Sequence, residues 1–423
     1  MRTVLMSAKY HSNLLFMIQL LTYTWTYFVQ IAGMFVAFLF AGLFVYLALR
    51  HFHSKWMRVA LVVVFLSVSI VFYVPNGLPR GLEYPLALTT YGPAEGPVLP
   101  IGNVWSLFKN FDHFERVTDI ARNPNEVPTP IERTEAATVH VELTTKEVVA
   151  EMAPGVFVNY WTFDGKIPGP MIRVREGDTV VLTLHNDKTS LHHHNIDLHA
   201  VTGPGGGAVS TMVAPGESAT VTFKALHPGA FVYHCATPNV ANHMTHGMYG
   251  LIVVDPREGM AKVDHEYYVM QGEYYATGGM GRKGLQLFDA EAMLNGNPTY
   301  IFFNGKVNGL GDSMQAKTGE KVRMFVGNGG VNLVSSFHVI GEIFDRVYPE
   351  ASITSVPLTD VQTTLVPAGG ATVVEFGLEV PGNYLLVDHA LSRLDKGAWG
   401  VLKVSGRENK EVYDGIVVSG HGH

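Results

Sequence analysis

The sequence is short of cysteine, of positive charge and, near its start, of charge altogether. A single cysteine, Cys235, stands among 423 residues, so an intrachain disulfide and a four-cysteine zinc or iron–sulfur site are both excluded. The formal net charge is −7, without the basic excess that nucleic-acid-binding proteins carry, so nucleic acid is not an expected partner. Between Tyr10 and Leu49 there is no Asp, Glu, Lys or Arg, which points to a membrane segment.

Apolar residues, histidine and methionine are abundant. Hydrophobic residues make up 47% of the chain, enough for a sizeable core, which excludes a largely disordered protein. At roughly 100–200 residues per domain, the length indicates two or three structural units. The chain contains 19 His and 16 Met, and both side chains bind soft and borderline metals. The search for function therefore begins with copper, zinc and iron.

Residues 1–75 are predicted to form a two-helix transmembrane anchor. The apolar run 27–49 makes a helix of about 34 Å, against a hydrocarbon core of roughly 30 Å. A second apolar run, 57–74, is stopped by Pro75. The loop between the two runs contains Arg50, Lys55 and Arg58, and this positive charge favours the cytoplasmic side. We therefore expect a multi-pass protein of a bacterial inner membrane, in contact with lipid, whose remaining domains face the periplasm.

An internal repeat organises the rest of the chain. Three segments recur in the same order at offsets of 142, 153 and 150 residues: 176–186 as 318–328, 228–231 as 381–384, and 247–251 as 397–401. Both copies alternate apolar and polar residues with period two, and Pro-Gly and Gly-Gly turns interrupt the alternation. The pattern predicts an all-β protein with two tandem β-sandwich or barrel domains.

The predicted domain boundaries follow from this repeat. A linker rich in Pro, Gly and aromatic residues covers 76–129. The two β domains are placed at 130–258 and 259–406, and a C-terminal tail covers 407–423.

Strand geometry divides the candidate metal ligands of the first copy into two sets. Side chains alternate faces along a strand, so neighbours such as His234 and Cys235 point apart, as do residues five apart such as His194 and His199. One consistent division places His194 and Cys235 on one side, and Asp197, His199 and His234 on the other. This division predicts two sites back to back.

The first site is completed by the loop after Cys235. His243 and Met248 follow the cysteine by 8 and 13 residues. Two His, one Cys and a weakly bound Met are the ligand set of a blue-copper electron-transfer centre. A lone cysteine is more often a small buried hydrophobic residue, but the ordered set on a β-sandwich is far more specific.

The second site contains only two His from the first copy. A catalytic metal site has three protein ligands and an open position, so the second copy must supply the third ligand. The candidates are His338 and His389. The repeat places Asp388 where the first copy has Cys235, so the second copy cannot hold a blue-copper centre of its own.

At these residues the sequence resembles the copper-containing nitrite reductases, which form nitric oxide. The resemblance runs from about residue 117 to 404. It rests on these segments: Tyr160-Trp161-Thr162-Phe163-Asp164-Gly165, Asn195-Ile196-Asp197-Leu198-His199-Ala200, Tyr233-His234-Cys235-Ala236, Ser336-Phe337-His338-Val339-Ile340-Gly341-Glu342 and Leu386-Val387-Asp388-His389. The resemblance implies two tandem cupredoxin-like domains. The chain departs from the family at His193 and His246.

The resemblance assigns roles to individual residues. It implies a type-1 copper on His194, Cys235, His243 and Met248, and a type-2 copper on His199, His234 and His389. His389 is implied to come from the neighbouring subunit of a homotrimer. Asp197 and His338 match the catalytic acid–base pair, and Ile340 matches the apolar residue that crowds the substrate nitrite. The implied reaction is NO2⁻ + 2H⁺ + e⁻ → NO + H2O, with electrons passing from the type-1 site through Cys235 and His234.

Other functions remain open at this stage. A laccase-like multicopper oxidase would need a histidine on each side of the cysteine, whereas Ala236 follows Cys235. A membrane-bound cupredoxin electron carrier would leave the second set of ligands unused, and a three-His zinc hydrolase would not need the cysteine site. The expected electron donor is either a periplasmic cupredoxin or cytochrome c, or a membrane quinol that binds to the anchor.

Overall fold

The computed structural model describes residues 32–33, 35–36, 38–51, 54–77, 114–276 and 278–415. The chain divides into two compact units. Of the residues described, a helical unit contains those before residue 78 and a β-rich unit contains those from 114 onward. Each unit is described below by itself.

The helical unit is a pair of packed helices. Residues 38–48 are helical and lead through the 3-10 turn η1 (Leu49–His51) toward helix α2 (Lys55–Gly77). A methyl group added at Gly42 would lie 3.2 Å from Leu66 Cδ1, and the Arg58 guanidinium lies 5.4 Å from the ring centroid of Tyr46. α2 includes the whole predicted run 57–74, whereas residues 27–31, 34 and 37 of the first run lie outside the described residues. Within the part of the chain that the structure describes, no helix meets the length and hydropathy needed to cross a membrane.

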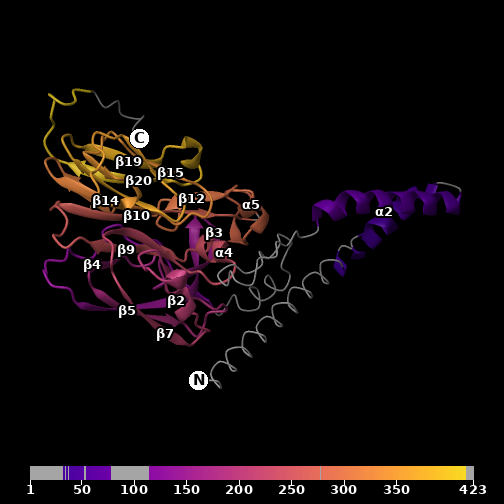
Figure 1. The fold of residues 1–423 in the computed structure, drawn as a ribbon. Helices are drawn as coiled ribbons and strands as arrows, with labels where there is room; N and C mark the ends of the chain where they lie inside the picture. Colours follow the sequence, from indigo (N-terminus) through magenta and orange to yellow (C-terminus); the bar gives the residue numbers. More distant parts are fainter. Residues whose placement is uncertain are drawn as a thin grey trace, which may run out of the picture. The chain divides into compact units, whose positions relative to one another are not determined.

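The first half of the β-rich unit contains two facing sheets (Figure 1). One sheet has the strand order β11-β3-β2-β5-β7, with β1 added beside β2, and the other has the order β4-β9-β8-β6. Their bounds are β1 (Glu115–Arg116), β2 (Thr138–Ala153), β3 (Val156–Phe163), β4 (Ile172–Arg175), β5 (Thr179–Asn186), β6 (Asp197–Leu198), β7 (Ser218–Lys224), β8 (Gly229–His234), β9 (Tyr249–Asp255) and β11 (Gly284–Gln286).

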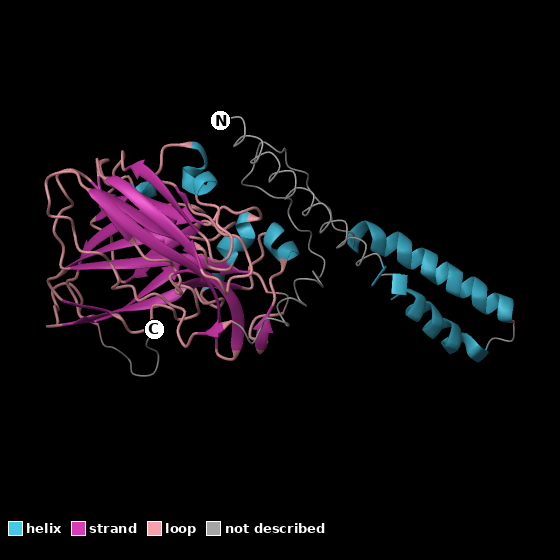
Figure 2. Ribbon diagram, turned by 90° about the horizontal axis from the view of Figure 1, so that it is seen from below, coloured by secondary structure: helices cyan, strands magenta, loops and turns pink. Residues whose placement is uncertain are grey.

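The second half repeats this arrangement with the sheet orders β12-β10-β14-β18-β16 and β13-β20-β19-β15-β17. Its strands are β10 (His265–Tyr274), β12 (Tyr300–Phe303), β13 (Met314–Lys317), β14 (Lys321–Asn328), β15 (Ser335–Ile340), β16 (Arg346–Tyr348), β17 (Thr363–Val366), β18 (Ala371–Gly377), β19 (Gly382–Asp388) and β20 (Trp399–Ser405). Figure 2 shows that the helical turns of this unit are short and lie between strands. They are η3 (Pro204–Ser210), α4 (Val240–Thr245), α5 (Ala290–Leu294), η4 (Pro349–Ala351) and η5 (Leu391–Arg393).

The predicted repeat is present in the structure. β5 pairs parallel with β2 and antiparallel with β7, and β14 pairs in the same way with β10 and β18. The turns before these strands contain Gly177 and Gly319 with φ of 92° and 88°, a conformation that glycine adopts without steric cost. The all-β prediction is confirmed for this unit.

Three buried clusters hold the β-rich unit together. Leu182, Phe163 and Cys235 belong to the core of the first half, and Met324 and Phe337 belong to that of the second. A third cluster combines strands of both halves. It includes Tyr160, Leu251, Tyr268 and Phe325. This shared cluster joins the two halves into one compact unit.

Two segments cross the boundaries expected from the sequence. Residues 114–129 fell in the predicted linker, but β1 pairs with β2 and Ile120 is fully buried, because its apolar side chain completes the shared core. β11 lies beyond residue 258, yet it pairs parallel with β3 of the first half.

Candidate metal centres

The end of strand β8 supplies donors to two separate groups of side chains. His234 is the last residue of β8 and Cys235 follows it, so the two side chains diverge. Ligand atoms converge within 4.8 Å in two groups of the described residues: His194, Cys235 and His243, and Asp197, His199 and His234. This is the same division that strand alternation predicts.

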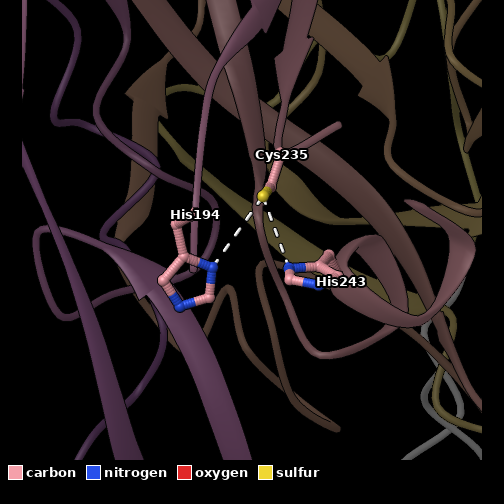
Figure 3. Close-up of side chains that lie close together, drawn as sticks. All are labelled: His194, Cys235 and His243. Carbon is pink, nitrogen blue, oxygen red and sulfur yellow. Dashed lines mark hydrogen bonds between the residues drawn. The ribbon is translucent and has the colours of Figure 1, made fainter. Parts of the chain in front are cut away.

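The first group is fully enclosed by protein. Figure 3 shows the sulfur of Cys235 directed toward both imidazoles. Cys235 Sγ lies 3.3 Å from His243 Nδ1 and 3.8 Å from His194 Nδ1. A metal about 2.3 Å from a thiolate and about 2.0 Å from each imidazole gives sulfur–nitrogen separations of roughly 3.5–3.8 Å. These residues therefore fit a metal ion with little movement.

Main-chain contacts hold the loop residues beside the cysteine. His243 lies on α4, and Met248 N donates to His243 O at 3.2 Å. Cys235 N donates to Met248 O at 3.1 Å. Met248 is therefore bonded through its main chain to both Cys235 and His243, and it is fully buried. His194 exchanges main-chain hydrogen bonds with Val213, which fixes it in an extended segment.

The surroundings of Cys235 favour a thiolate. Burial acts to raise the pKa of the Cys235 thiol, but the imidazoles of His243 and His194 outweigh it and hold the pKa well below its ordinary value. Asn195 N donates to the sulfur at 3.5 Å, and Asn195 Oδ1 accepts from Ala236 N at 2.6 Å. A thiolate with two imidazoles is a donor set for copper.

The second group presents two imidazoles whose outer nitrogens face each other. His199 Nε2 and His234 Nε2 lie 3.1 Å apart, which is close to the roughly 3.1–3.4 Å expected for two imidazoles on one metal ion. His234 Nδ1 bonds to Cys235 O at 3.0 Å, and His199 bonds to the backbone of Gly369 in the second half of the unit. Such contacts orient a ligating imidazole. Burial and the neighbouring His234 lower the pKa of His199, which favours the neutral ring that binds metal.

Asp197 adjoins this pair. Asp197 Oδ2 lies 3.8 Å from His234 Nε2, and the Asp197 side chain is 24% exposed, so solvent reaches it. The glycine-rich turn η3 approaches Asp197 closely: a Cβ added at Gly206 would lie 1.8 Å from Asp197 Oδ1.

His338 and His389 form a pair of their own in the second half of the unit. β15 and β19 are adjacent antiparallel strands, and their register places the two imidazole centroids 5.4 Å apart. His338 Nδ1 bonds to Gln362 O at 2.5 Å, and Ile340 is 41% exposed on the same strand. His389 is exposed and belongs to neither convergent group of the described chain. Within its described residues, a single chain therefore brings together only Asp197, His199 and His234 at the second group.

Sequence reasoning missed two neighbours of these groups. Gly206 stands in the run Gly205-Gly206-Gly207, a visible signal for close approach of the backbone. Glu147 is buried beside the first group, but it sits in an ordinary strand far upstream of the ligands and carries no motif.

Comparison with known proteins identifies the family. The family model described as "Multicopper oxidase" matches residues 144–259. A copper-containing nitrite reductase of Neisseria meningitidis serogroup A / serotype 4A is 53% identical over 290 residues, covering 68% of this chain and 75% of the relative. The copper-containing nitrite reductase of Alcaligenes faecalis is 35% identical over 291 residues, covering 64% and 77%. Among solved structures, the copper nitrite reductase from Nitrosomonas europaea is 36% identical, with a TM-score of 0.57, and covers 66% of this chain and 98% of that one.

These similarities agree with the donor groups. The fold is all-β and cupredoxin-like. Ala236 stands where an oxygen-reducing trinuclear site would need a histidine, and a simple electron carrier would have no use for the second group. With more than half of the aligned residues identical to a nitrite reductase across three quarters of its length, the chain belongs to the copper-containing nitrite reductases, which reduce nitrite and contain type-1 and type-2 copper.

Proposed function

We propose that His194, Cys235, His243 and Met248 hold the type-1 copper. The type-2 copper binds His199 and His234 of one subunit and His389 of a neighbouring subunit. The observation that carries this proposal is the divergence of Cys235 and His234 at the end of β8 into two convergent groups. The peptide unit between these two residues is the covalent route for an electron between the groups.

The chemistry at the second group converts nitrite to nitric oxide: NO2⁻ + 2H⁺ + e⁻ → NO + H2O. When bound, copper is a Lewis acid that withdraws charge from the nitrite oxygens. Asp197 and His338 supply the two protons as general acids. The bond from His338 Nδ1 to the Gln362 carbonyl holds the ring and leaves Nε2 to exchange protons. Ile340, exposed on β15, limits the space available to the substrate.

Two substitutions at the second group test this assignment. His199→Ala removes a ligand, so the purified protein should lose nitrite reduction and one copper per subunit but keep its visible absorption. Asp197→Asn keeps the shape and removes the acid, so both coppers should stay while turnover falls by roughly 10²-fold or more. Wild-type copper content in His199→Ala, or a wild-type rate in Asp197→Asn, would contradict the assignment of that residue.

The active enzyme is proposed to be a homotrimer. His389 is exposed and lies outside the group formed by His199 and His234 in its own chain. A cyclic arrangement of three subunits supplies each group with His389 from the next subunit.

The N-terminal segment is proposed to hold the enzyme at the periplasmic face of a bacterial inner membrane. The support is the absence of charge from Tyr10 to Leu49 and the positive loop that follows it. The electron donor is then either a periplasmic cupredoxin or cytochrome c, or a membrane quinol bound at the anchor.

A membrane assay distinguishes these donors. If quinol is the donor, full-length protein in lipid nanodiscs should oxidise quinol with nitrite and no added carrier protein. Protein lacking residues 1–75 should lose that reaction and keep dye-driven nitrite reduction. Equally slow quinol oxidation by both proteins would exclude quinol and indicate a soluble carrier as the donor. In a separate test, recovery of the full-length protein in the soluble cell fraction would contradict the membrane anchor.

A further inference from the structure

A buried carboxylate lies beside the first donor group and takes no part in the reaction described above. Glu147 is on β2, directly opposite Trp161 on β3, and its side chain is fully buried. Trp161 packs against His192 with ring centroids 4.2 Å apart and against His246 at 4.4 Å, nearly parallel. Because the Glu147 side chain has no exposed surface, its charge acts through a medium of low dielectric constant.

Hydrogen bonds indicate that Glu147 is ionised and fixed in place. Its Oε1 accepts from Leu191 N at 2.7 Å, from His192 N at 3.0 Å and faces His192 Nδ1 at 3.0 Å. A carboxylate that accepts hydrogen bonds from several N–H groups is stabilised in its charged form. The main-chain donors belong to the segment that leads into His194.

In the part of the chain that the structure describes, Glu147 and the proposed ligand His194 each have a buried polar side-chain atom without a hydrogen-bond partner. Among the described residues, neither His194 Nε2 nor Glu147 Oε2 has a hydrogen-bond partner, and Nε2 lies 3.6 Å from Glu147 Oε1. His194 directs Nδ1 toward Cys235 Sγ. A neutral imidazole that ligates through Nδ1 has its proton on Nε2, where it needs an acceptor.

We infer that Glu147 is a positioning residue of the type-1 centre, which accepts the outer Nε2–H of His194 and lowers the reduction potential of the copper by its negative charge. The inference rests on the proposed ligand set. An oxidised centre has one more positive charge than the reduced centre. A nearby buried anion therefore stabilises the oxidised form more, and the potential falls. A lower potential at this centre favours onward transfer of the electron to the second group.

The matched experiment compares two substitutions of buried glutamates. Glu147→Gln removes the charge but keeps an oxygen for Leu191 N and His192 N. The control is Glu273→Gln, because Glu273 on β10 is also buried, accepts from Leu333 N at 2.8 Å and lies in the second half of the unit. Spectroelectrochemical titration of the visible band in copper-loaded protein gives the potential of each variant.

The expected result is specific to Glu147. Glu147→Gln should raise the reduction potential by at least about 59 mV. For a one-electron couple, this shift is a tenfold change in the equilibrium constant for electron exchange. Glu273→Gln should leave the potential at its wild-type value. An unchanged or lowered potential in Glu147→Gln, or an equal rise in both variants, would overturn the inference. A wild-type protein without a visible band would instead contradict the ligand set.

A measurement on the wild-type protein keeps the test open if Glu147→Gln does not fold. In the reduced, copper-loaded protein, NMR should show a slowly exchanging His194 Nε2–H shifted downfield by its hydrogen bond. A rapidly exchanging proton without that shift would show that Glu147 does not accept it, and the inference would fail.

Discussion

The proposed type-1 assignment of the first donor group depends on Cys235, because it is the only cysteine in the sequence. Cys235→Ala should abolish the strong visible absorption, since a thiolate bound to copper is its source. The second group keeps all its side chains, so its copper should stay. Nitrite reduction with a donor that enters at the type-1 site should fall to background. Absorption spectra and copper analysis of the purified variant measure both effects.

Thr237→Val provides the matched control for this prediction. Cys235 Sγ lies 3.3 Å from Thr237 Oγ1, and valine keeps the shape of threonine without the hydroxyl. The visible band should persist in Thr237→Val because all proposed ligands remain. A visible band that survives in Cys235→Ala would show that the cysteine is not a ligand.

At the scale of single elements, the turn η3 positions Asp197. Gly206 has φ of 55°, and a side chain there would collide with Asp197 Oδ1. Gly206→Ala should therefore displace the carboxylate and lower nitrite turnover at least about tenfold, approaching the loss expected for an absent general acid. Copper content should stay at the wild-type level. In Asp197→Asn the added Gly206→Ala change should have little further effect, because both act on the same group.

Gly203→Ala is the control within the same loop. A Cβ at Gly203 meets nothing closer than 4.0 Å, so this variant should turn over at the wild-type rate. An equal loss of nitrite turnover in Gly203→Ala and Gly206→Ala would indicate a general effect on the loop. The positioning role of Gly206 would then be wrong.

The turn after β15 makes stability depend on pH. Burial, with the charges of Glu379 and Asp345, raises the pKa of Glu342 to about 8. The unfolded chain ionises this group above about pH 4.3, so the contribution of Glu342 to folding stability falls as pH rises from there to about 8 and is then constant. Glu342→Gln removes this loss and should raise the thermal midpoint at pH 8, relative to wild type, by about 2 °C or more. At pH 4 the two proteins should differ little.

Glu379→Gln tests the cause of that shift. Removing the neighbouring charge lowers the pKa of Glu342, so the variant should lose stability over a narrower pH range than the wild type. Thermal melts across pH 4–9 follow all three proteins. An unchanged pH dependence in Glu342→Gln would assign the effect to other groups.

Strand alternation explains how much of the site was predictable. His234 and Cys235 had to diverge because they are neighbours at a strand end, and His243 and Met248 follow in the same short loop. The place of Glu147 was not predictable, because it depends on the pairing of β2 with β3 and on the approach of the segment that contains His192. The burial of Ile120 in the shared core was not predictable either, because it depends on residues far away in the sequence that no local pattern identifies.

At the scale of the whole molecule, the proposed function places each active site between two subunits. His389 pairs with His338 in its own chain and does not converge with His199 and His234. Co-expression of His234→Ala chains with His389→Ala chains therefore tests the assembly directly. Each variant alone should be inactive. In equal random mixtures, about a quarter of the interfaces join an intact His234 to an intact His389, so about a quarter of wild-type nitrite reduction should return.

The control places both substitutions in one chain. When the His234→Ala/His389→Ala double variant is co-expressed equally with wild type, sites shared between subunits predict about a quarter of wild-type activity, whereas sites complete within one chain predict about half. The two models also differ in the first mixture, where sites within one chain predict no recovery because every chain lacks one ligand. Copper-loaded oligomers of known composition, assayed with a dye donor, give both ratios. No recovery in the first mixture together with half activity in the second would show that His389 acts within its own chain, and the shared site would be wrong.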